Sequence, residues 1–300
     1  MSTSIVFEEF GTLEVLQVRE TELPEPGAGE VRIANRAISI NPADWKLVAG
    51  YFQDFRPVEL PAVPGNETAG VVTAVGPGVT QFRVGDEVVW YGFTGGYSAE
   101  ANVRVDELAT KPANVDFDQA ASLPVAAGTA TAALRQIRVG AGDTVLIHGA
   151  AGGVGVAAVQ LARHLGANVI GTASSRNHEY LRSLGARPVA YGPDLVAAVR
   201  DLGPITAVFD TYGGPETVAA TVALLPDRAR AVTAVPDESA AAAGISPVGR
   251  ERYPLDALLG LTAQGIVRFP IHERIPLTEV TRALEISQRG HVRGKLILEP

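Results

Sequence analysis

The pattern of hydrophobic and polar residues changes character partway along the chain. Up to about Lys111, short runs rich in β-branched residues alternate with turns that contain glycine and proline. The clearest runs are 31–40, 69–75 and 86–91, and a typical turn between them is Gly76-Pro77-Gly78. Such runs bounded by turn residues predict β-strands. The first part of the chain is therefore expected to form a β-rich, barrel-like domain.

From about Asp116 the pattern becomes helical and then alternates. An alanine-rich helix is predicted over 118–137, interrupted near Leu123 and Pro124 because proline breaks a helix. After it, predicted strands alternate with predicted helices: strands at 144–148, 168–172, 187–190, 205–209 and 229–235, and helices at 154–165, 177–184, 194–201 and 216–224. This alternation predicts a parallel sheet with helices on both faces.

The last part of the chain changes pattern again. From about Leu255 an apolar helix is predicted to end near Gly265, followed by a strand at 266–270, a helix at 277–289 and a strand at 295–298. We expect these last strands to return to the first domain.

The most informative segment is the glycine turn, residues 149–155, which follows the strand 144–148 and begins the next helix. It reads Gly149, Ala150, Ala151, Gly152, Gly153, Val154, Gly155. Glycine permits a tight turn at the strand end, close approach of the backbone to a phosphate, and close packing of helix on sheet. A strand, a glycine turn and a helix together predict a dinucleotide whose pyrophosphate lies at the helix N-terminus. The uncharged stretch 144–162 is long enough for a membrane span, but its central glycines and changing periodicity disfavour one.

The residues after the second strand of this unit indicate which nicotinamide cofactor is bound. An acid that would hold the ribose 2′-hydroxyl of NAD is absent until Glu179. Ser174, Ser175 and Arg176 instead offer two hydroxyls and a guanidinium for a 2′-phosphate, which favours NADPH. The alternative is that Ser175 caps the following helix and Arg176 is solvated.

Other cofactor contacts are expected where parallel strands end, because ligands bind outside the carboxyl ends of such strands. Asp210 and Thr211 follow one predicted strand, and Thr233 to Val235 close another. We therefore expect these residues to line the cofactor site.

The amino-acid composition excludes several kinds of functional site. The chain has no cysteine, which excludes disulfides, thiolate nucleophiles and cysteine-bound zinc. Its five histidines are scattered without metal-ligand spacing, and its net charge of −8 with no basic block argues against nucleic-acid binding. The N-terminus does not resemble a signal peptide, and a cytoplasmic location without membrane attachment is expected.

Several motifs in order along the chain carry a family resemblance. They lie at 41–44 (Asn-Pro-Ala-Asp), 63–70, 84–88, 96–100, 123–130, the glycine turn and 294–298. Together they resemble the medium-chain dehydrogenase/reductase superfamily, in particular its zinc-free quinone oxidoreductase branch. The resemblance implies an α/β protein: a GroES-like β-barrel catalytic domain (1–117 and 256–300) and a Rossmann doubly wound parallel-sheet cofactor domain (118–255).

The resemblance also implies roles for individual residues. Metal-dependent members carry cysteine and histidine at the positions that match Asn41 and Asn66, so no zinc is expected. Asn41 would face the nicotinamide, a turn at 127–129 would bring Thr129 close to it, and Tyr191 would lie near the adenosine phosphate. Many relatives carry a tyrosine at the position that matches Phe52, and Tyr51 lies one residue before that position. The family pairs edge strands into a homodimer, here near 244–248.

Two of these positions also have purely structural interpretations. The order Asn41, Pro42, Asp44 suits a helix start, with Asn41 as N-cap and Asp44 in the first turn. The alternative for Thr129 is a position inside an alanine-rich helix.

These observations predict an NADPH-dependent, metal-independent reductase that transfers hydride to a quinone or an α,β-unsaturated carbonyl. Asn41, Tyr51 and Thr129 are the candidate catalytic residues, with Asn41 as hydrogen-bond donor to the carbonyl. The alternatives are an enoyl-thioester reductase and a non-catalytic NADPH-binding protein with a sensory or structural role.

Overall fold

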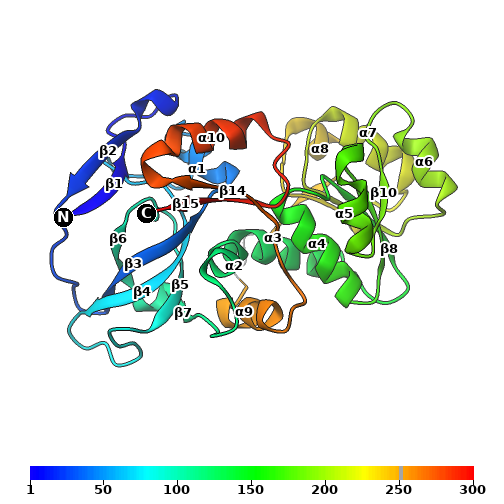
Figure 1. Cartoon of the computed structure of the whole chain (residues 1–300). Helices are drawn as coiled ribbons and strands as arrows, with labels where there is room; N and C mark the ends of the chain where they lie inside the picture. Colours follow the sequence, from blue (N-terminus) through cyan, green and yellow to red (C-terminus); the bar gives the residue numbers. More distant parts are fainter. Residues whose placement is uncertain (250–252) are drawn as a thin grey trace. The chain divides into compact units, whose positions relative to one another are not determined.

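The computed structural model describes residues 1–249 and 253–300 and contains two compact units, shown in sequence colours in Figure 1. Unit 1 comprises Met1–Val125, Leu255–Ala263 and Pro270–Pro300. Unit 2 comprises Ala126–Pro254 and Gln264–Phe269. Each unit is described by itself.

Unit 1 is built on a mainly antiparallel sheet, the GroES-like part of the chain. Its strand order is β14 (Ile271–Pro276), β15 (Lys295–Glu299), β3 (Glu30–Ser39), β4 (Glu67–Val75), β5 (Glu87–Tyr91) and β7 (Leu108–Thr110), and β6 (Glu100–Arg104) also pairs with β3. Strands β1 (Ser2–Val6) and β2 (Gln17–Thr21) form a separate pair. The three strands predicted from the hydrophobic runs are confirmed as β3, β4 and β5. In β3 alternate residues from Val31 to Ala37 are buried, as expected for a strand with one face on a core.

Short helices complete unit 1: α1 (Pro42–Val48), α2 (Phe117–Ala121), α9 (Leu255–Ala263) and α10 (Val280–Arg289), with 3₁₀ turns η1 (Leu13–Val15), η2 (Val105–Glu107) and η5 (Leu277–Glu279). The predicted break near Pro124 is confirmed, because α2 ends at Ala121 and α3 (Leu123–Gln136) begins two residues later. Thr129 lies inside α3, so the expected turn at 127–129 is wrong. The alanine-rich sequence around it favours continuous helix.

The C-terminal segment differs in one element from its prediction. The expected strand at 266–270 is wrong, since the strand begins at Ile271. The backbone of Arg268 is instead held by the Gln160 side chain, which donates to its carbonyl (2.9 Å) and accepts from its N–H (3.0 Å). A side chain thus takes the place of a neighbouring strand there. The return of the C-terminus to unit 1 is confirmed, because Ile297 and Leu298 of β15 pair with Ser39 and Ile38 of β3.

Unit 2 is a six-stranded parallel sheet, the Rossmann-like part of the chain. Its order is β10 (Arg187–Val189), β9 (Asn168–Thr172), β8 (Thr144–His148), β11 (Ala207–Asp210), β12 (Ala231–Thr233) and β13 (Ser246–Pro247). The helices between strands are α4 (Gly153–His164), α5 (His178–Ser183), α6 (Leu195–Asp201), α7 (Pro215–Leu224) and α8 (Glu238–Ala242), with 3₁₀ turns η3 (Ser175–Asn177) and η4 (Arg228–Arg230). The predicted alternation is confirmed, although β12 is shorter than the expected 229–235.

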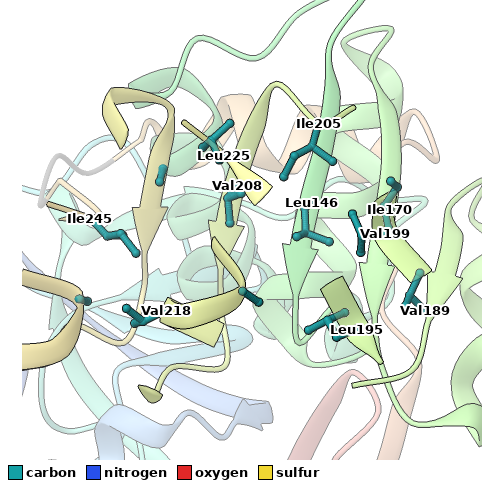
Figure 2. Packing of buried hydrophobic residues seen from close by; sticks show 13 residues of the cluster. Leu146, Ile170, Val189, Leu195, Val199, Ile205, Val208, Val218, Leu225 and Ile245 are labelled. Carbon is teal, nitrogen blue, oxygen red and sulfur yellow. The ribbon is translucent and has the colours of Figure 1, made fainter. Parts of the chain in front are cut away.

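The sheet of unit 2 is covered on both faces. Figure 2 shows one layer, where Leu146, Ile170 and Val208 from neighbouring strands pack with Val199 of α6 and Val218 of α7. Val145 and Ile147 flank Leu146 in β8 and are also fully buried. Because successive side chains point to opposite faces, β8 is buried on both sides. Packing on both faces holds these strands in place, and the residues of the candidate site follow their carboxyl ends.

In the part of the chain that the structure describes, no helix is both long and apolar enough to span a membrane.

Candidate functional site

The glycine turn of unit 2 is held by contacts with the neighbouring strands. Gly149 follows β8 with a φ of 69°, a conformation that favours glycine. The Gly149 N–H donates to Thr172 Oγ1 (3.2 Å), and Thr211 Oγ1 donates to the carbonyl of His148 (2.6 Å). A Cβ atom on Gly155 would overlap the carbonyl oxygen of Gly149. The sequence therefore needs glycine at 149 and 155 for the fold itself.

Gly152 is different, because a Cβ atom there would meet only the Gly149 carbonyl oxygen, at an ordinary 3.5 Å. It is the N-cap of α4, with φ −76° and ψ 173°, which any residue can adopt. Gly153, Val154 and Gly155 form the first turn of α4, where backbone N–H groups lack partners within the helix. The turn thus leaves open backbone at the start of a helix, a geometry that suits a phosphate.

This contrast gives a paired prediction. Gly155→Ala should lower the free energy of unfolding by about 2 kcal/mol or more through overpacking against the backbone, whereas Gly152→Ala should change it by less than about 1 kcal/mol. Urea unfolding of both variants measures the difference. Equal destabilisation would contradict the packing shown here.

Several side chains gather at the carboxyl ends of β8, β11 and β12, which are adjacent in the sheet. The Asp210 carboxylate accepts from the N–H groups of Tyr212 and Gly213 (2.9 Å each) and from the Thr217 hydroxyl (2.8 Å). Thr233 Oγ1 accepts from the N–H of Val235 (3.0 Å). Asp210, Thr211 and Thr233 therefore shape the turns at this edge. Contact of these residues and Val235 with a cofactor stays a prediction.

The second predicted cofactor segment follows β9. Ser174 is half-buried, and Ser175 and Arg176 are exposed at the start of η3. Tyr191 is exposed and stacks on Tyr212, with ring centroids 6.3 Å apart and an interplanar angle of 20°. Tyr212 was not predicted, although it directly follows Asp210 and Thr211 at the strand end. The pair forms an exposed aromatic surface on the same unit as the glycine turn.

His148 is a buried titratable group at the end of β8. Its side chain is fully buried, and its Nε2 has no hydrogen-bond partner. Burial lowers the pKa of His148 to about 4, and the nearby Asp210 carboxylate acts in the opposite direction. His148 is therefore neutral at physiological pH.

Unit 1 contains a polar cluster, defined here as Asn41, Asn66, Glu67 and Lys295. The Lys295 ammonium donates to Asn41 Oδ1 (2.7 Å) and to Glu67 Oε1 (2.9 Å). Asn41 Nδ2 donates to Glu67 Oε1 (2.7 Å) and to Asn66 Oδ1 (3.1 Å). Asn41, Glu67 and Lys295 are all buried, while Asn66 is partly exposed. The second Glu67 oxygen accepts from the N–H of Val125 (2.7 Å).

Asp44 and Tyr97 lie next to this cluster. Asp44 Oδ2 accepts from the N–H of Asn41 (2.8 Å) and from the Tyr97 hydroxyl (2.7 Å), which confirms the helix-start interpretation of Asp44. Burial raises the pKa of Asp44 to about 7, and the nearby Glu67 charge acts in the same direction. The hydrogen bonds from Asn41 and Tyr97 and the charge of Lys295 act in the opposite direction. Burial and the Asp44 charge raise the pKa of Tyr97 well above its usual value.

The three candidate catalytic residues have different surroundings. Both Asn41 amide hydrogens are already donated within unit 1. Tyr51 is exposed, and its ring forms a T-shaped pair with Trp45, with ring centroids 6.4 Å apart. Thr129 is half-buried in α3. Their catalytic roles stay predictions.

Glu67, Lys295, Tyr97 and His148 were missed as functional candidates. Glu67 and Lys295 did carry a signal, because each is a charged residue in a run of otherwise apolar or small residues (Glu-Thr-Ala-Gly and Lys-Leu-Ile-Leu). Charged residues are rarely fully buried unless they are paired. Such a position in a predicted core strand therefore indicates an ion pair, although not its partner.

Comparisons with known proteins place this geometry in a family. The alcohol dehydrogenase GroES-like domain matches residues 27–113, and the family described as zinc-binding dehydrogenase matches residues 153–245. A quinone oxidoreductase of Pseudomonas aeruginosa is 35% identical over 100% of both chains. The crystal structure of Escherichia coli quinone oxidoreductase complexed with NADPH matches with a TM-score of 0.84 and 29% identity, covering 99% of this chain and 100% of the other.

A third relative is much larger than this chain. The pikromycin polyketide synthase component PikAII of Streptomyces venezuelae is 45% identical over 181 residues, which is 58% of this chain but only 5% of that protein. The full-length match to the Pseudomonas protein and the shared architecture of both units are decisive. The chain belongs to the quinone oxidoreductase branch of the medium-chain dehydrogenase/reductase superfamily.

Proposed function

We propose that this chain is an NADPH-dependent oxidoreductase that reduces a quinone or an α,β-unsaturated carbonyl without a metal ion. The observation that carries the proposal is the glycine turn, where Gly155 is closely packed and Gly152 is open at the start of α4. The backbone of Gly152, Gly153 and Val154 would hold the pyrophosphate at the N-terminus of that helix. The NADPH named for the related E. coli structure supports this cofactor.

Three residues support NADPH over NADH. Ser174, Ser175 and Arg176 lie together at the end of β9 and the start of η3. They would bind the 2′-phosphate through two hydroxyl donors and a guanidinium. Tyr191 and Tyr212 would flank the adenosine part of the cofactor. For Tyr191 this agrees with the position that the family resemblance implies. When bound, NADPH supplies the hydride, and the chain's own residues bind it and the acceptor, orient them and exclude water.

Arg176→Ala should therefore raise the Kd for NADPH about 10-fold to 100-fold, since a charge-assisted hydrogen bond contributes about 1.5–3 kcal/mol. The Kd for NADH should change little. Titration of the bound cofactor's fluorescence measures both, and Arg182→Ala, which removes an exposed arginine of α5, is the matched control. Equal weakening of NADPH and NADH would contradict the 2′-phosphate role.

A zinc ion does not fit the polar cluster of unit 1. The positions that matched zinc ligands in the resemblance hold Asn41 and Asn66, and amides are weak ligands for this metal. The Asn41 oxygen and the Glu67 carboxylate already accept hydrogen bonds from the Lys295 ammonium. A dication next to that ammonium would be repelled. In the described part of the chain, no group of three or more His, Cys, Asp or Glu side chains is arranged to hold a metal ion.

The acceptor class follows from this chemistry. Without a Lewis acid to stabilise an alkoxide, alcohol oxidation is disfavoured, and hydride transfer to an already electrophilic carbon is favoured. A panel of small quinones and enones, assayed by NADPH consumption, tests the proposal. Turnover of at least one class is expected. Tight NADPH binding with no turnover of any acceptor would overturn it and favour the non-catalytic alternative.

An enoyl-thioester reductase is the second candidate. It is favoured by the similarity to polyketide synthases such as PikAII, to which 58% of this chain matches. Including an unsaturated acyl-thioester in the same panel separates the two. A kcat/KM for the thioester far above that for free enones would favour this second candidate.

We also propose a homodimer formed through the sheet of unit 2. Strand β13 (Ser246–Pro247) is exposed and pairs only with β12 within the described chain, which leaves an open sheet edge. Multi-angle light scattering should give twice the mass of the 31.3 kDa chain.

A further inference from the structure

The Lys295 ammonium fixes the orientation of two amides in the polar cluster. An ammonium has only donors, so the Asn41 atom facing it at 2.7 Å must be the oxygen. The nitrogen of Asn41 then faces Glu67 Oε1 at 2.7 Å, where a carboxylate accepts. The same nitrogen faces Asn66 at 3.1 Å, so the Asn66 atom on that side must also be the oxygen. Amide orientations are usually ambiguous, but this chain of donors leaves one consistent solution.

One group remains free as a result. The Asn66 side-chain nitrogen donates to no other group in residues 1–249 and 253–300, whereas Asn41 has donated both of its amide hydrogens. Asn66 is partly exposed, and the three residues behind it are buried. The cluster therefore presents one oriented N–H₂ group at the surface of unit 1. Behind it lies the buried ion pair of Lys295 and Glu67, and Asn41 links the ammonium of that pair to Asn66.

The backbone holds Asn66 firmly in this place. Its carbonyl accepts from the N–H of Gly92 (3.0 Å), and the next residue, Glu67, begins β4. Glu67 itself is anchored by the N–H of Val125 and by Lys295. A donor fixed by its neighbours loses little freedom when it meets an acceptor, which is the condition for electrostatic stabilisation of developing charge.

We propose that Asn66, and not Asn41, donates the hydrogen bond to the carbonyl oxygen of the acceptor, and that Lys295 and Asn41 are positioning residues for it. The inference rests on the proposed function. Addition of hydride to the electrophilic carbon moves an electron pair onto the carbonyl oxygen, which then takes a proton from water to give an enol. With a quinone as acceptor, this enol tautomerises to the hydroquinone. Asn66 meets that oxygen while it is negative. The ammonium strengthens the donor through the hydrogen-bonded chain Lys295, Asn41, Asn66.

The direct test replaces the donor. Asn66→Ala and the near-isosteric Asn66→Asp, which puts an acceptor where the donor was, should each lower kcat/KM by a factor of about 100 to 1,000, the usual effect of losing one such donor. The Kd for NADPH and the urea midpoint should stay close to wild type. If the wild type turns over an acceptor and Asn66→Ala retains at least half of its kcat/KM, the inference is overturned while the proposed function stands. If the wild type reduces no acceptor, both are overturned.

A double-mutant cycle tests the positioning role. Lys295→Met should lower kcat/KM by a factor of about 10 to 100, as losing a supporting partner does elsewhere, but it should have no further effect once Asn66 is alanine. A merely structural role would give independent, multiplied losses in the double variant, and that result would refute the positioning role. Lys111→Met is the matched control, because Lys111 is also buried in unit 1 and paired with Glu87 at 2.8 Å. It should lose stability without losing kcat.

Discussion

Lys295→Met is expected to lower the free energy of unfolding by about 3–5 kcal/mol, because it leaves a buried carboxylate without its partner. The side chain of Glu67 is fully buried, and that of Lys295 is 4% exposed. After the substitution, Glu67 would keep the Asn41 amide and the Val125 N–H as donors. These cannot replace a full positive charge 2.9 Å away.

Urea unfolding at neutral pH measures this loss, and two further variants make it interpretable. The double variant Lys295→Met with Glu67→Gln should recover much of it, since both buried charges are then gone. Arg282→Ala is the exposed counterpart: Arg282 pairs with Glu273 at 2.7 Å, but both side chains are about 40% exposed, so its loss should be under about 1 kcal/mol. A Lys295→Met effect no larger than that of Arg282→Ala would show that the cluster is not desolvated as described.

The fold could be predicted from the sequence where local rules decide it. The strands β3, β4, β5, β8 and β9 follow from β-branched runs between turn residues, and the order of strands and helices in unit 2 follows from their alternation. The glycine turn was also predictable, because Gly149 and Gly155 satisfy steric needs of a strand–turn–helix connection. Errors arose where tertiary contacts override local preference. At 266–270, the Gln160 side chain holds a segment that reads as a strand.

The polar cluster could not be predicted, for a related reason. Lys295 and Glu67 are 228 positions apart, and they meet only because β15 and β4 both flank β3. A one-residue shift in the pairing of Leu298 with Ile38 would turn Lys295 to the other face of the sheet. The family resemblance predicted Asn41 as a hydrogen-bond donor to the acceptor. It could not show that the Asn41 hydrogens are used internally, because that depends on where three other side chains point.

Two buried groups, one in each unit, should give this protein pH dependences of opposite sign. Burial raises the pKa of Asp44 to about 7, above its ordinary value of 3.8. Between these values the unfolded chain loses a proton that the folded chain keeps, so Asp44 lowers stability as pH rises. Burial lowers the pKa of His148 from 6.5 to about 4. Between these values the unfolded chain binds a proton that the folded chain does not, so His148 lowers stability as pH falls.

From about pH 4 to 6.5, the contributions of Asp44 and His148 to the free energy of unfolding change with pH in opposite directions. These two groups should therefore change the stability of the wild type little in that range. Single variants should separate the two contributions. Asp44→Asn keeps an oxygen that can accept from Asn41 and Tyr97. From pH 5 to pH 8, its free energy of unfolding should increase by about 3 kcal/mol relative to that of the wild type, since one pKa unit corresponds to about 1.4 kcal/mol. His148→Leu removes a ring nitrogen that has no partner and should instead gain about 2 kcal/mol relative to wild type between pH 7 and pH 5.

Urea unfolding of the three proteins at pH 5, 6, 7 and 8 measures both differences. The stability difference between Asp44→Asn and wild type must grow as pH rises, because Asp44 keeps in the folded protein a proton that it loses in the unfolded chain. The difference between His148→Leu and wild type must shrink as pH rises, because His148 stays neutral in the folded protein at pH values where it is protonated in the unfolded chain. The charges facing Asp44 are those of Glu67 and Lys295, and the charge facing His148 is that of Asp210. In both cases desolvation outweighs these charges. A flat difference for either variant would mean that water reaches that side chain in the folded protein.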